Sequence, residues 1–287
     1  ASIPAMVSKW IADLIAAFAA AAALSLVLVA VGAWILVRKS IAPIVAVTDN
    51  MRRFMADAAH ELKTPVAVLR ANAEVALHKE REPEAYRSAL QTTQTEAERL
   101  GCIIDRLLLL SRADAGERKI ERTSFYLDDV ASEAFAEARV IANRSNVHLE
   151  MEGFEEATVT GDPSLIREMI LIFLDNAVKF TPAGGHVTMA VRNDAHPELT
   201  VRDTGIGIAP EHMPHVFDRF YRADTSRDRA GGAGLGLSIA KWIADQHDAQ
   251  ISFTSIEGDG TLVMVAFPRS SDSPPRSESA PADLASV

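Results

Sequence analysis

The stretch Phe54-Met-Ala-Asp-Ala-Ala-His60-Glu61-Leu-Lys-Thr64-Pro65 decides how this chain is organised. Apolar residues recur through it and just beyond it at spacings of three and four, which predicts a helix with one apolar face. These residues are Phe54, Ala58, Leu62, Val66 and Leu69. His60 falls at the edge of that face, with Glu61 beside it. It is therefore either a solvated surface histidine or an imidazole nucleophile on a rigid helix, and the rest of the chain must decide.

The composition indicates a globular protein of one to three domains. The 287 residues are 48% hydrophobic and 24% charged, with a formal net charge of -10. This acidic balance gives no support for direct binding of nucleic acid. Cys102 is the single cysteine, so a disulfide framework and a cysteine metal cluster are both excluded.

A membrane-spanning helix is predicted over residues 11–37, after a short N-terminal segment, residues 1–10. Residues 14–37 contain no charged side chain, and about 20 apolar residues suffice to cross a bilayer. Trp10 and Trp34 lie near the two ends, where aromatic rings favour the membrane interface. Basic residues are in excess on the C-terminal side, which predicts that this side lies in the cytoplasm. A buried core helix is the alternative, although apolar runs of this length are rare in soluble cores.

Three other segments are predicted to connect or follow the folded parts. Residues 38–50 form a juxtamembrane linker, in which Pro43 is expected to break the helix or bend its exit. Residues 115–122 are polar, with a glycine and alternating charges, and are predicted to be a second linker. Residues 269–287 are rich in serine and proline, which predicts a disordered tail.

Residues 51–114 predict a helical hairpin. Its helices cover residues 51–77 and 84–113, and a proline-containing turn separates them. One hairpin cannot bury both of its apolar stripes, whereas two hairpins can do so as a four-helix bundle, so we expect a homodimer. The alternative is a hairpin that packs on the next domain of the same chain.

Residues 123–268 predict one α+β domain. Asp162-Pro163 is a helix start signal, because a capping side chain precedes a proline in the first turn. The pattern predicts helices over residues 127–142, 163–180 and 235–247, and strands over residues 147–152, 157–160, 186–193, 198–202, 251–257 and 261–267.

Two stretches of this domain carry groups suited to a metal ion, a phosphate or an adenine. Asn176 and Lys179 share one face of a helix, where an amide oxygen suits Mg²⁺ and a lysine suits a phosphate. Asp203-Thr-Gly205-Ile-Gly207 follows a strand. Its carboxylate could accept a hydrogen bond from an adenine amino group, and its glycines would let a ligand approach the backbone. A solvated helix end and a plain turn are the alternatives.

Two further stretches follow in the same domain. Phe217-Asp-Arg219-Phe220-Tyr221-Arg222 interleaves aromatic residues with arginines that could anchor a mobile lid and hold phosphates. Its alternative is a small satellite core with solvated arginines. Gly231-Gly232-Ala-Gly234-Leu-Gly236 opens a helix, and backbone N–H groups at such a start attract phosphate. The pattern is neither the dinucleotide-binding arrangement nor a P-loop.

Taken together and in this order after the hairpin, the stretches resemble those of a two-component sensor histidine kinase. The resemblance covers about residues 50 to 268. His60-Glu61-Leu-Lys-Thr64-Pro65 is similar to the phospho-acceptor box, and the asparagine, first glycine, phenylalanine and second glycine boxes follow. The implied fold is a membrane-anchored multidomain chain. It has one transmembrane helix, an all-α hairpin that forms a dimeric four-helix bundle, and an α+β two-layer ATP-binding sandwich of the gyrase/Hsp90-like type.

The resemblance also implies cofactors, partners and a location. ATP and Mg²⁺ are the expected cofactors. The expected partners are a second copy of the chain, a cytoplasmic response regulator and the lipid bilayer. The chain would cross the bacterial inner (cytoplasmic) membrane once, with its catalytic part in the cytoplasm. Residues 38–47 are similar only to the start of a HAMP relay, so the signal would pass directly or through a partner.

Individual roles follow from the matching positions. His60 would accept the γ-phosphoryl group, Glu61 would act as general base, and Thr64 would help to place a water that dephosphorylates the regulator. Asn176 would hold Mg²⁺, with Glu168 as a second candidate ligand. The remaining matching residues would surround the nucleotide: Lys179, Asp203, Gly205, Gly207, Tyr221, Arg222, Gly232, Gly234, Leu235 and Gly236.

One position departs from the pattern of the family. The asparagine box usually carries a second asparagine four residues before Asn176, and this chain has Ile172 there. The departure favours a second interpretation, a weakly active member that acts mainly as a phosphatase on its regulator. A third interpretation is a non-enzymatic membrane receptor whose ATP-binding fold serves as a scaffold.

Overall fold

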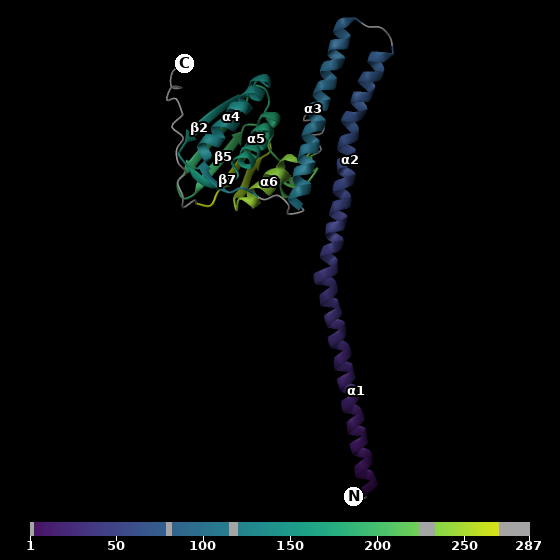
Figure 1. The fold of residues 1–287 in the computed structure, drawn as a ribbon. Helices are drawn as coiled ribbons and strands as arrows, with labels where there is room; N and C mark the ends of the chain where they lie inside the picture. The colour runs from purple at the N-terminus through teal and green to yellow at the C-terminus, as the bar shows by residue number, and fades with distance from the viewer. Residues whose placement is uncertain (1–2, 79–81, 115–119, 224–232, 270–287) are drawn as a thin grey trace. The chain divides into compact units, whose positions relative to one another are not determined.

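The computed structural model describes residues 3–78, 82–114, 120–223 and 233–269 (Figure 1). The chain divides into two compact units, Ala1–His60 and Glu61–Val287. The boundary falls within one long helix, so each unit is described by itself.

The first unit is dominated by helix α1, Ile3–Leu36. Within it, the segment Asp13–Lys39 is 27 residues long with a mean hydropathy of 2.7, and none of it is buried against the rest of the described chain. By length and composition it can cross a membrane. At its C-terminal end the Arg38 guanidinium lies 4.7 Å from the centroid of the Trp34 ring, which suits an aromatic and a basic side chain at a membrane interface.

Of the two outcomes expected at Pro43, a break or a bend of the helix, the break is wrong. Helix α1 runs into a π-helical turn, Val37–Ile41, and helix α2, Ala42–Leu77, follows directly. Pro43 therefore lies in the first turn of α2, where its missing N–H group and fixed φ are tolerated. The irregularity that the proline requires is accommodated by the π turn before it.

Helix α2 carries the phospho-acceptor stretch and continues through Pro65 to Leu77. Pro65 is buried, and because it has no N–H group it cannot donate to the carbonyl oxygen of Glu61 one turn earlier. Helix α3, Pro83–Asp114, begins with the proline of the predicted turn. The two predicted helices of the hairpin are thus confirmed, and residues 79–81 of the turn lie outside the described residues. Several apolar side chains along both helices are exposed: Val66, Val75, Leu90, Ile104 and Leu108.

The remaining elements build an α+β sandwich in which the predicted helices and strands recur to within about two residues. They are β1 (Thr123–Tyr126), α4 (Leu127–Arg144), β2 (His148–Phe154), β3 (Thr158–Gly161), α5 (Pro163–Phe180), β4 (His186–Asn193), β5 (Pro197–Asp203), a 3₁₀ turn (Met213–His215), α6 (Gly236–Gln246), β6 (Gln250–Ile256) and β7 (Gly260–Ala266). The short strand β1 is not predicted from the sequence, because its four residues run straight into α4.

The main sheet has the strand order β2-β4-β5-β7-β6, with β2 parallel to β4 and the other neighbours antiparallel. Strands β1 and β3 form a separate antiparallel pair. Helix α5 packs against α4, α6 and strand β5. The Asp162 carboxylate caps α5 as predicted, because it accepts hydrogen bonds from the N–H groups of Ser164 (3.0 Å) and Leu165 (3.2 Å).

Alternation along β4 and β5 determines which side chains reach the core. Val191 pairs with Leu199, Met189 with Val201, and Val187 with Asp203. The apolar members are all buried, and burial of each such side chain contributes about 1.5–3 kcal/mol. Because side chains on a strand alternate with a period of two, the same face that buries the apolar residues also buries the carboxylate of Asp203 at the strand end.

Candidate functional site

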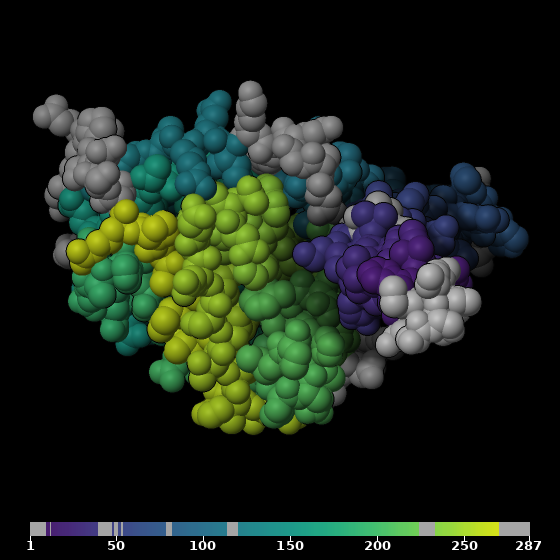
Figure 2. All heavy atoms as spheres, turned by 90° about the horizontal axis from the view of Figure 1, so that it is seen from below, coloured from purple at the N-terminus to yellow at the C-terminus, as the bar shows by residue number. Residues whose placement is uncertain are grey.

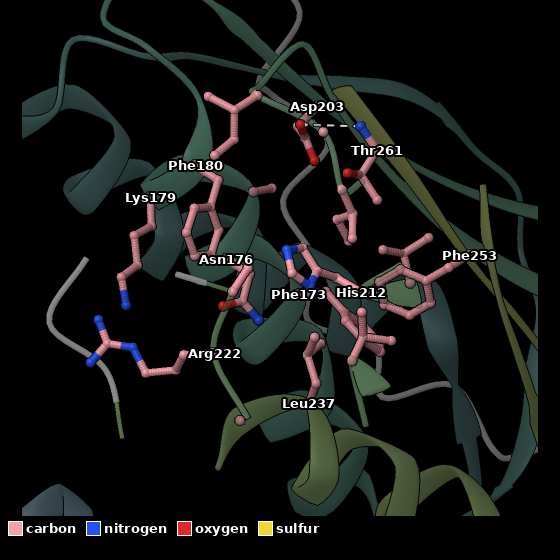
Figure 3. A pocket seen from close by; sticks show the side chains of 18 of the residues that line it. Phe173, Asn176, Lys179, Phe180, Asp203, His212, Arg222, Leu237, Phe253 and Thr261 are labelled. Atoms are coloured by element: carbon pink, nitrogen blue, oxygen red, sulfur yellow. Dashed lines mark hydrogen bonds between the residues drawn. The ribbon is translucent and has the colours of Figure 1, made fainter. Parts of the chain in front are cut away.

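A cavity of about 500 Å³ opens where α5, the end of β5 and the start of α6 meet (Figure 3). Asp203 and Thr261 lie at one end of the labelled side chains in Figure 3, and Lys179 and Arg222 lie at the other, with Asn176 between them. Phe173 and Phe253 add an apolar wall in an edge-to-face contact, with ring centroids 6.3 Å apart. The cavity is therefore polar at both ends and apolar along its side.

Asp203 provides a hydrogen-bond acceptor inside the cavity. The side chain is only 8% exposed. Its Oδ1 accepts hydrogen bonds from the N–H groups of Gly205 (2.8 Å) and Thr261 (3.2 Å). Burial raises the pKa of the carboxyl group, and these two hydrogen bonds oppose the rise. The other carboxylate oxygen points into the cavity (Figure 3), where it can accept a hydrogen bond from a ligand amino group.

The glycines after Asp203 are required by the protein's own packing. Gly207 has φ 66°, and a Cβ atom there would lie 2.0 Å from the carbonyl oxygen of Ile256. A Cβ atom on Gly205 would lie 2.6 Å from the carbonyl oxygen of Phe180. Gly207 lines the cavity and Gly205 does not. Both glycines therefore let the loop pack against β6 and the end of α5. The expectation that they also admit a ligand stays a prediction.

Helix α5 presents its polar face to the other end of the cavity. Asp175, Asn176 and Lys179 all line it. Burial lowers the pKa of Lys179, the neighbouring Asp175 raises it, and the positive charge of Arg222 lowers it further. Figure 3 shows the charged ends of Lys179 and Arg222 near each other. Two positively charged side chains at this end of the cavity suit an anionic ligand.

The phenylalanine-rich stretch meets the glycine-rich stretch beside the cavity. The Phe220 N–H group donates to the carbonyl oxygen of Gly234 (2.9 Å). Phe220 has φ 61° and Gly234 has φ 66°. For a bulky residue such as phenylalanine this conformation costs about 1–3 kcal/mol, so the surrounding contacts must impose it. Tyr221 is fixed next to it, because its hydroxyl group lies 2.8 Å from Nδ1 of His212.

The loop between β5 and the phenylalanine-rich stretch is anchored on the β6–β7 hairpin. The Ile208 N–H group donates to Ser255 Oγ (2.8 Å), and the Gly258 N–H group donates to the Ile206 carbonyl oxygen (2.8 Å). Figure 2 shows these two segments, in green and yellow-green, adjoining on one face of the molecule. The loop that carries the cavity wall is thus held to a neighbouring strand pair by one hydrogen bond to a side-chain hydroxyl group and one between backbone groups.

The chain matches two family models. Residues 50–116 match the His Kinase A (phospho-acceptor) domain, and residues 161–271 match the histidine kinase-, DNA gyrase B- and HSP90-like ATPase. The chain belongs to the sensor histidine kinase family. The predicted fold class is confirmed as one N-terminal apolar helix, a helical hairpin and an ATPase sandwich.

Relatives and solved structures agree with this family. The chain is 36% identical over 219 residues to the sensor-like histidine kinase SenX3 of Mycobacterium bovis, which covers 76% of this chain and 53% of the relative. It resembles full-length ShkA in complex with AMPPNP (TM-score 0.59, 20% identity, 77% of this chain, 47% of that one). It also resembles ThkA in complex with the response regulator protein TrrA (TM-score 0.60, 18% identity, 83% and 66%). At these identities the structural likeness concerns the fold. The chain spans about half the length of the curated relatives it matches.

Most residues of the family boxes converge on the cavity. Asn176, Lys179, Asp203, Gly207, Tyr221, Arg222, Gly234 and Gly236 line it. Leu235 does not, because it is completely buried in the core at the start of α6. Glu168 does not line it either. It precedes Asn176 by eight residues on α5, which is about 12 Å along the helix axis. Gly232 lies outside the described residues, as does most of the polar run at residues 223–230 that follows the phenylalanine-rich stretch and is expected to belong to a mobile lid.

Three residues of the phospho-acceptor box lie together on α2. His60 and Thr64 are exposed, and Glu61 is half-buried. His60 and Thr64 are four residues apart, so they share one face of the helix. The predicted exposure of His60 at the edge of the apolar face is confirmed.

Some residues of the cavity could not be found from the sequence. Thr261 contributes through its backbone N–H group, which leaves no trace in the residue type. His212 and Phe253 stand apart from the boxes and reach the cavity only through the packing of the loop and of β6. Asp175 directly precedes Asn176, so its place beside the asparagine could have been noted from the helical spacing.

Proposed function

We propose that the chain is a membrane-anchored, dimeric histidine kinase that phosphorylates His60 from ATP and passes the group to an aspartate of a response regulator. One observation carries this proposal. The cavity pairs a buried acceptor, Asp203, with the cations Lys179 and Arg222 at the opposite end, an arrangement complementary to an adenine at one end and phosphates at the other. The relatives ShkA and ThkA, solved with AMPPNP and with a response regulator respectively, support the same ligand and partner.

The residues present fit both ATP and Mg²⁺. The second carboxylate oxygen of Asp203, which faces the cavity, would accept a hydrogen bond from the adenine amino group. Phe173 and Phe253 would contact the adenine ring. Lys179 and Arg222 would neutralise phosphate charge. Asn176 would hold Mg²⁺, because an amide oxygen is a suitable hard ligand. When bound, the metal would add charge neutralisation at the phosphates, which with positioning supplies most of the catalysis in phosphoryl transfer.

His60 would act as the nucleophile. A neutral imidazole nitrogen would form the bond to the γ-phosphorus while the bond to the bridging oxygen breaks, and ADP would leave with that electron pair. Glu61 would take the proton that the imidazole loses. The exposure of His60 on α2 meets a requirement of this sequence, because the nucleotide domain and the regulator must both reach the same nitrogen.

The dimer and the membrane location are parts of the same proposal. The exposed apolar side chains of α2 and α3 would be covered when two hairpins, residues 51–114, form a four-helix bundle. Residues 11–37 would span the bacterial inner membrane once. The catalytic domain, residues 123–268, would then lie in the cytoplasm. Linkers at residues 38–50 and 115–122 would connect the parts.

A phosphatase function remains a second candidate, and one observation favours it. Ile172 lines the cavity as a buried apolar side chain, 4% exposed, so it offers no metal ligand at that position. Thr64, exposed on the same face of α2 as His60, would place the attacking water on the phosphorylated regulator.

The test uses the full chain in detergent or nanodiscs with γ-labelled ATP and Mg²⁺. We expect an acid-labile, alkali-stable label on the wild-type chain and none on His60→Gln. The His78→Gln variant, which removes another histidine of the hairpin, serves as the matched control and should retain the label. Label that persists in His60→Gln would refute the kinase proposal. Wild-type chain that takes no label but dephosphorylates a regulator would favour the phosphatase.

A further inference from the structure

Helix α5 presents a stripe of four residues to the cavity, and only some of them carry an oxygen atom that could bind a metal ion. Ile172, Asp175, Asn176 and Lys179 all line the cavity, at spacings of three and four that place them on neighbouring positions of one helix face. Ile172 is apolar, and its Cγ2 lies 3.3 Å from the position of a Cβ atom built on Gly236. It therefore packs against the start of α6 and supplies no oxygen to a ligand. The oxygen-bearing side chains of the stripe are Asp175 and Asn176.

A magnesium ion that accompanies a triphosphate is usually held by one or two carboxylates together with phosphate oxygens and waters. Four carboxylates line the cavity: Asp175, Asp203, Glu211 and Glu257. Asp203 is engaged by two backbone N–H groups at the end of the cavity away from Lys179 and Arg222. Glu257 belongs to the segment that packs on Gly207, next to Asp203. Glu211 is exposed in the loop after β5. Of the four, Asp175 is the carboxylate that shares a helical turn with Asn176 and Lys179.

The carboxylate of Asp175 is free to act as a ligand. Among the described residues, none donates a hydrogen bond to it or forms an ion pair with it within 4.0 Å. Its charge nevertheless acts on this end of the cavity, since it opposes the fall in the pKa of Lys179. Two positively charged side chains already face the phosphate position. A carboxylate beside them has no role in binding phosphate, but it suits a divalent cation bound to that phosphate.

We propose that Asp175 is a ligand of the nucleotide-bound magnesium ion, together with Asn176, and that it supplies the oxygen that Ile172 cannot. This inference rests on the proposed function, because it requires ATP in the cavity. Asp175 binds the metal and does not contact the adenine. Removal of its carboxylate must therefore weaken the binding of the metal ion more than the binding of the nucleotide.

The test measures Mn²⁺ binding, since carboxylate, amide and water oxygens suit Mn²⁺ and Mg²⁺ alike. Free Mn²⁺ is titrated by electron paramagnetic resonance against the full chain saturated with a non-hydrolysable ATP analogue. Affinity for the analogue alone is measured in parallel by calorimetry with EDTA present. Asp175→Asn is the test variant. Glu150→Gln is its matched control, because it removes an exposed carboxylate of the same domain that does not line the cavity. Thermal unfolding checks that both variants fold.

We expect Asp175→Asn to raise the Kd of Mn²⁺ about 10- to 100-fold, the range typical even of residues that only orient metal ligands. Its metal-free affinity for the analogue should stay equal or rise, because a negative charge near the phosphates is removed. Glu150→Gln should change neither quantity. Mn²⁺ affinity within twofold of wild type in Asp175→Asn, or an equal loss in Glu150→Gln, would overturn this inference alone. Absence of analogue binding by the wild-type chain would overturn the proposed function, and this inference with it.

Discussion

Replacement of Asp203 by asparagine should separate nucleotide binding from folding. In the folded protein, Oδ1 of Asp203 accepts hydrogen bonds from Gly205 and Thr261, and the second oxygen faces the cavity. Asparagine keeps an acceptor for the two backbone N–H groups and places an NH₂ group where the second oxygen was. An adenine amino group would then meet a donor instead of an acceptor.

The magnitude follows from two effects. A hydrogen bond to a charged acceptor contributes about 1.5–3 kcal/mol, and a donor left without an acceptor costs about 1–3 kcal/mol more. A loss of about 3 kcal/mol corresponds to a roughly 100-fold rise in the Kd for ATP. The free energy of unfolding should stay equal or increase, because asparagine does not carry the charge that burial makes unfavourable in Asp203.

The pH dependence has a defined sign. The folded-state pKa of Asp203 is raised above its unfolded value, so the folded state binds the proton more tightly. The carboxylate therefore costs stability above that pKa, and the cost disappears as the pH falls through it. Protonation also converts the acceptor into a donor. As the pH is lowered, the affinity for ATP should therefore begin to fall at a higher pH than it would with an aspartate of ordinary pKa. This pH-dependent fall should be absent in Asp203→Asn.

Calorimetry with ATP and with adenosine, together with thermal unfolding, measures both effects. Lys179→Met is the matched comparison at the other end of the cavity. It should weaken the binding of ATP and leave the binding of adenosine almost unchanged. Asp203→Asn should weaken both ligands by a similar factor. The reasoning is refuted if Asp203→Asn binds ATP within threefold of wild type, or if its Tm falls by several degrees.

Three further outcomes can be checked. Gly234→Ala should lower the Tm and weaken the binding of ATP, because its Cβ atom would lie within 2.8 Å of the neighbouring backbone. Gly258 has a similar positive φ but open space around it, so Gly258→Ala should lower the free energy of unfolding by only about 1 kcal/mol. Equal effects of the two variants in thermal unfolding would contradict the packing argument. Burial lowers the pKa of His247, so the unfolded state binds the proton more tightly than the folded state does. The free energy of unfolding should therefore fall as the pH drops below about 6.5. Denaturation curves measured against pH should show a smaller fall in His247→Gln, and an unchanged fall would contradict this assignment. Tyr221→Phe removes the hydrogen bond to His212 and should lower the free energy of unfolding in urea by about 0.5–1.5 kcal/mol. An unchanged value would show that this bond does not stabilise the fold.

The sequence alone accounted for most of the local structure. Asp162-Pro163 and the apolar spacing after it define where α5 begins and ends, since capping and helical periodicity act over a few residues. The charge-free run of residues 14–37 likewise locates the apolar segment Asp13–Lys39, because composition is a local property of the sequence. The order of the five boxes indicated the family and its ATP site, because box residues are recognised by type and spacing.

Only the tertiary structure decided which of these residues meet. Leu235 carries the expected spacing but is core, while Thr261 enters the site through a backbone N–H group that any residue could provide. A side chain on Gly205 would collide with the end of α5, and one on Gly207 would collide with β6. Such contacts join segments far apart in the chain, and no local pattern encodes them. His60 is the reverse case: its exposure follows from helical spacing, whereas the phosphoryl transfer proposed for it would need a cavity that only the packing of the distant α5, β5 and α6 creates.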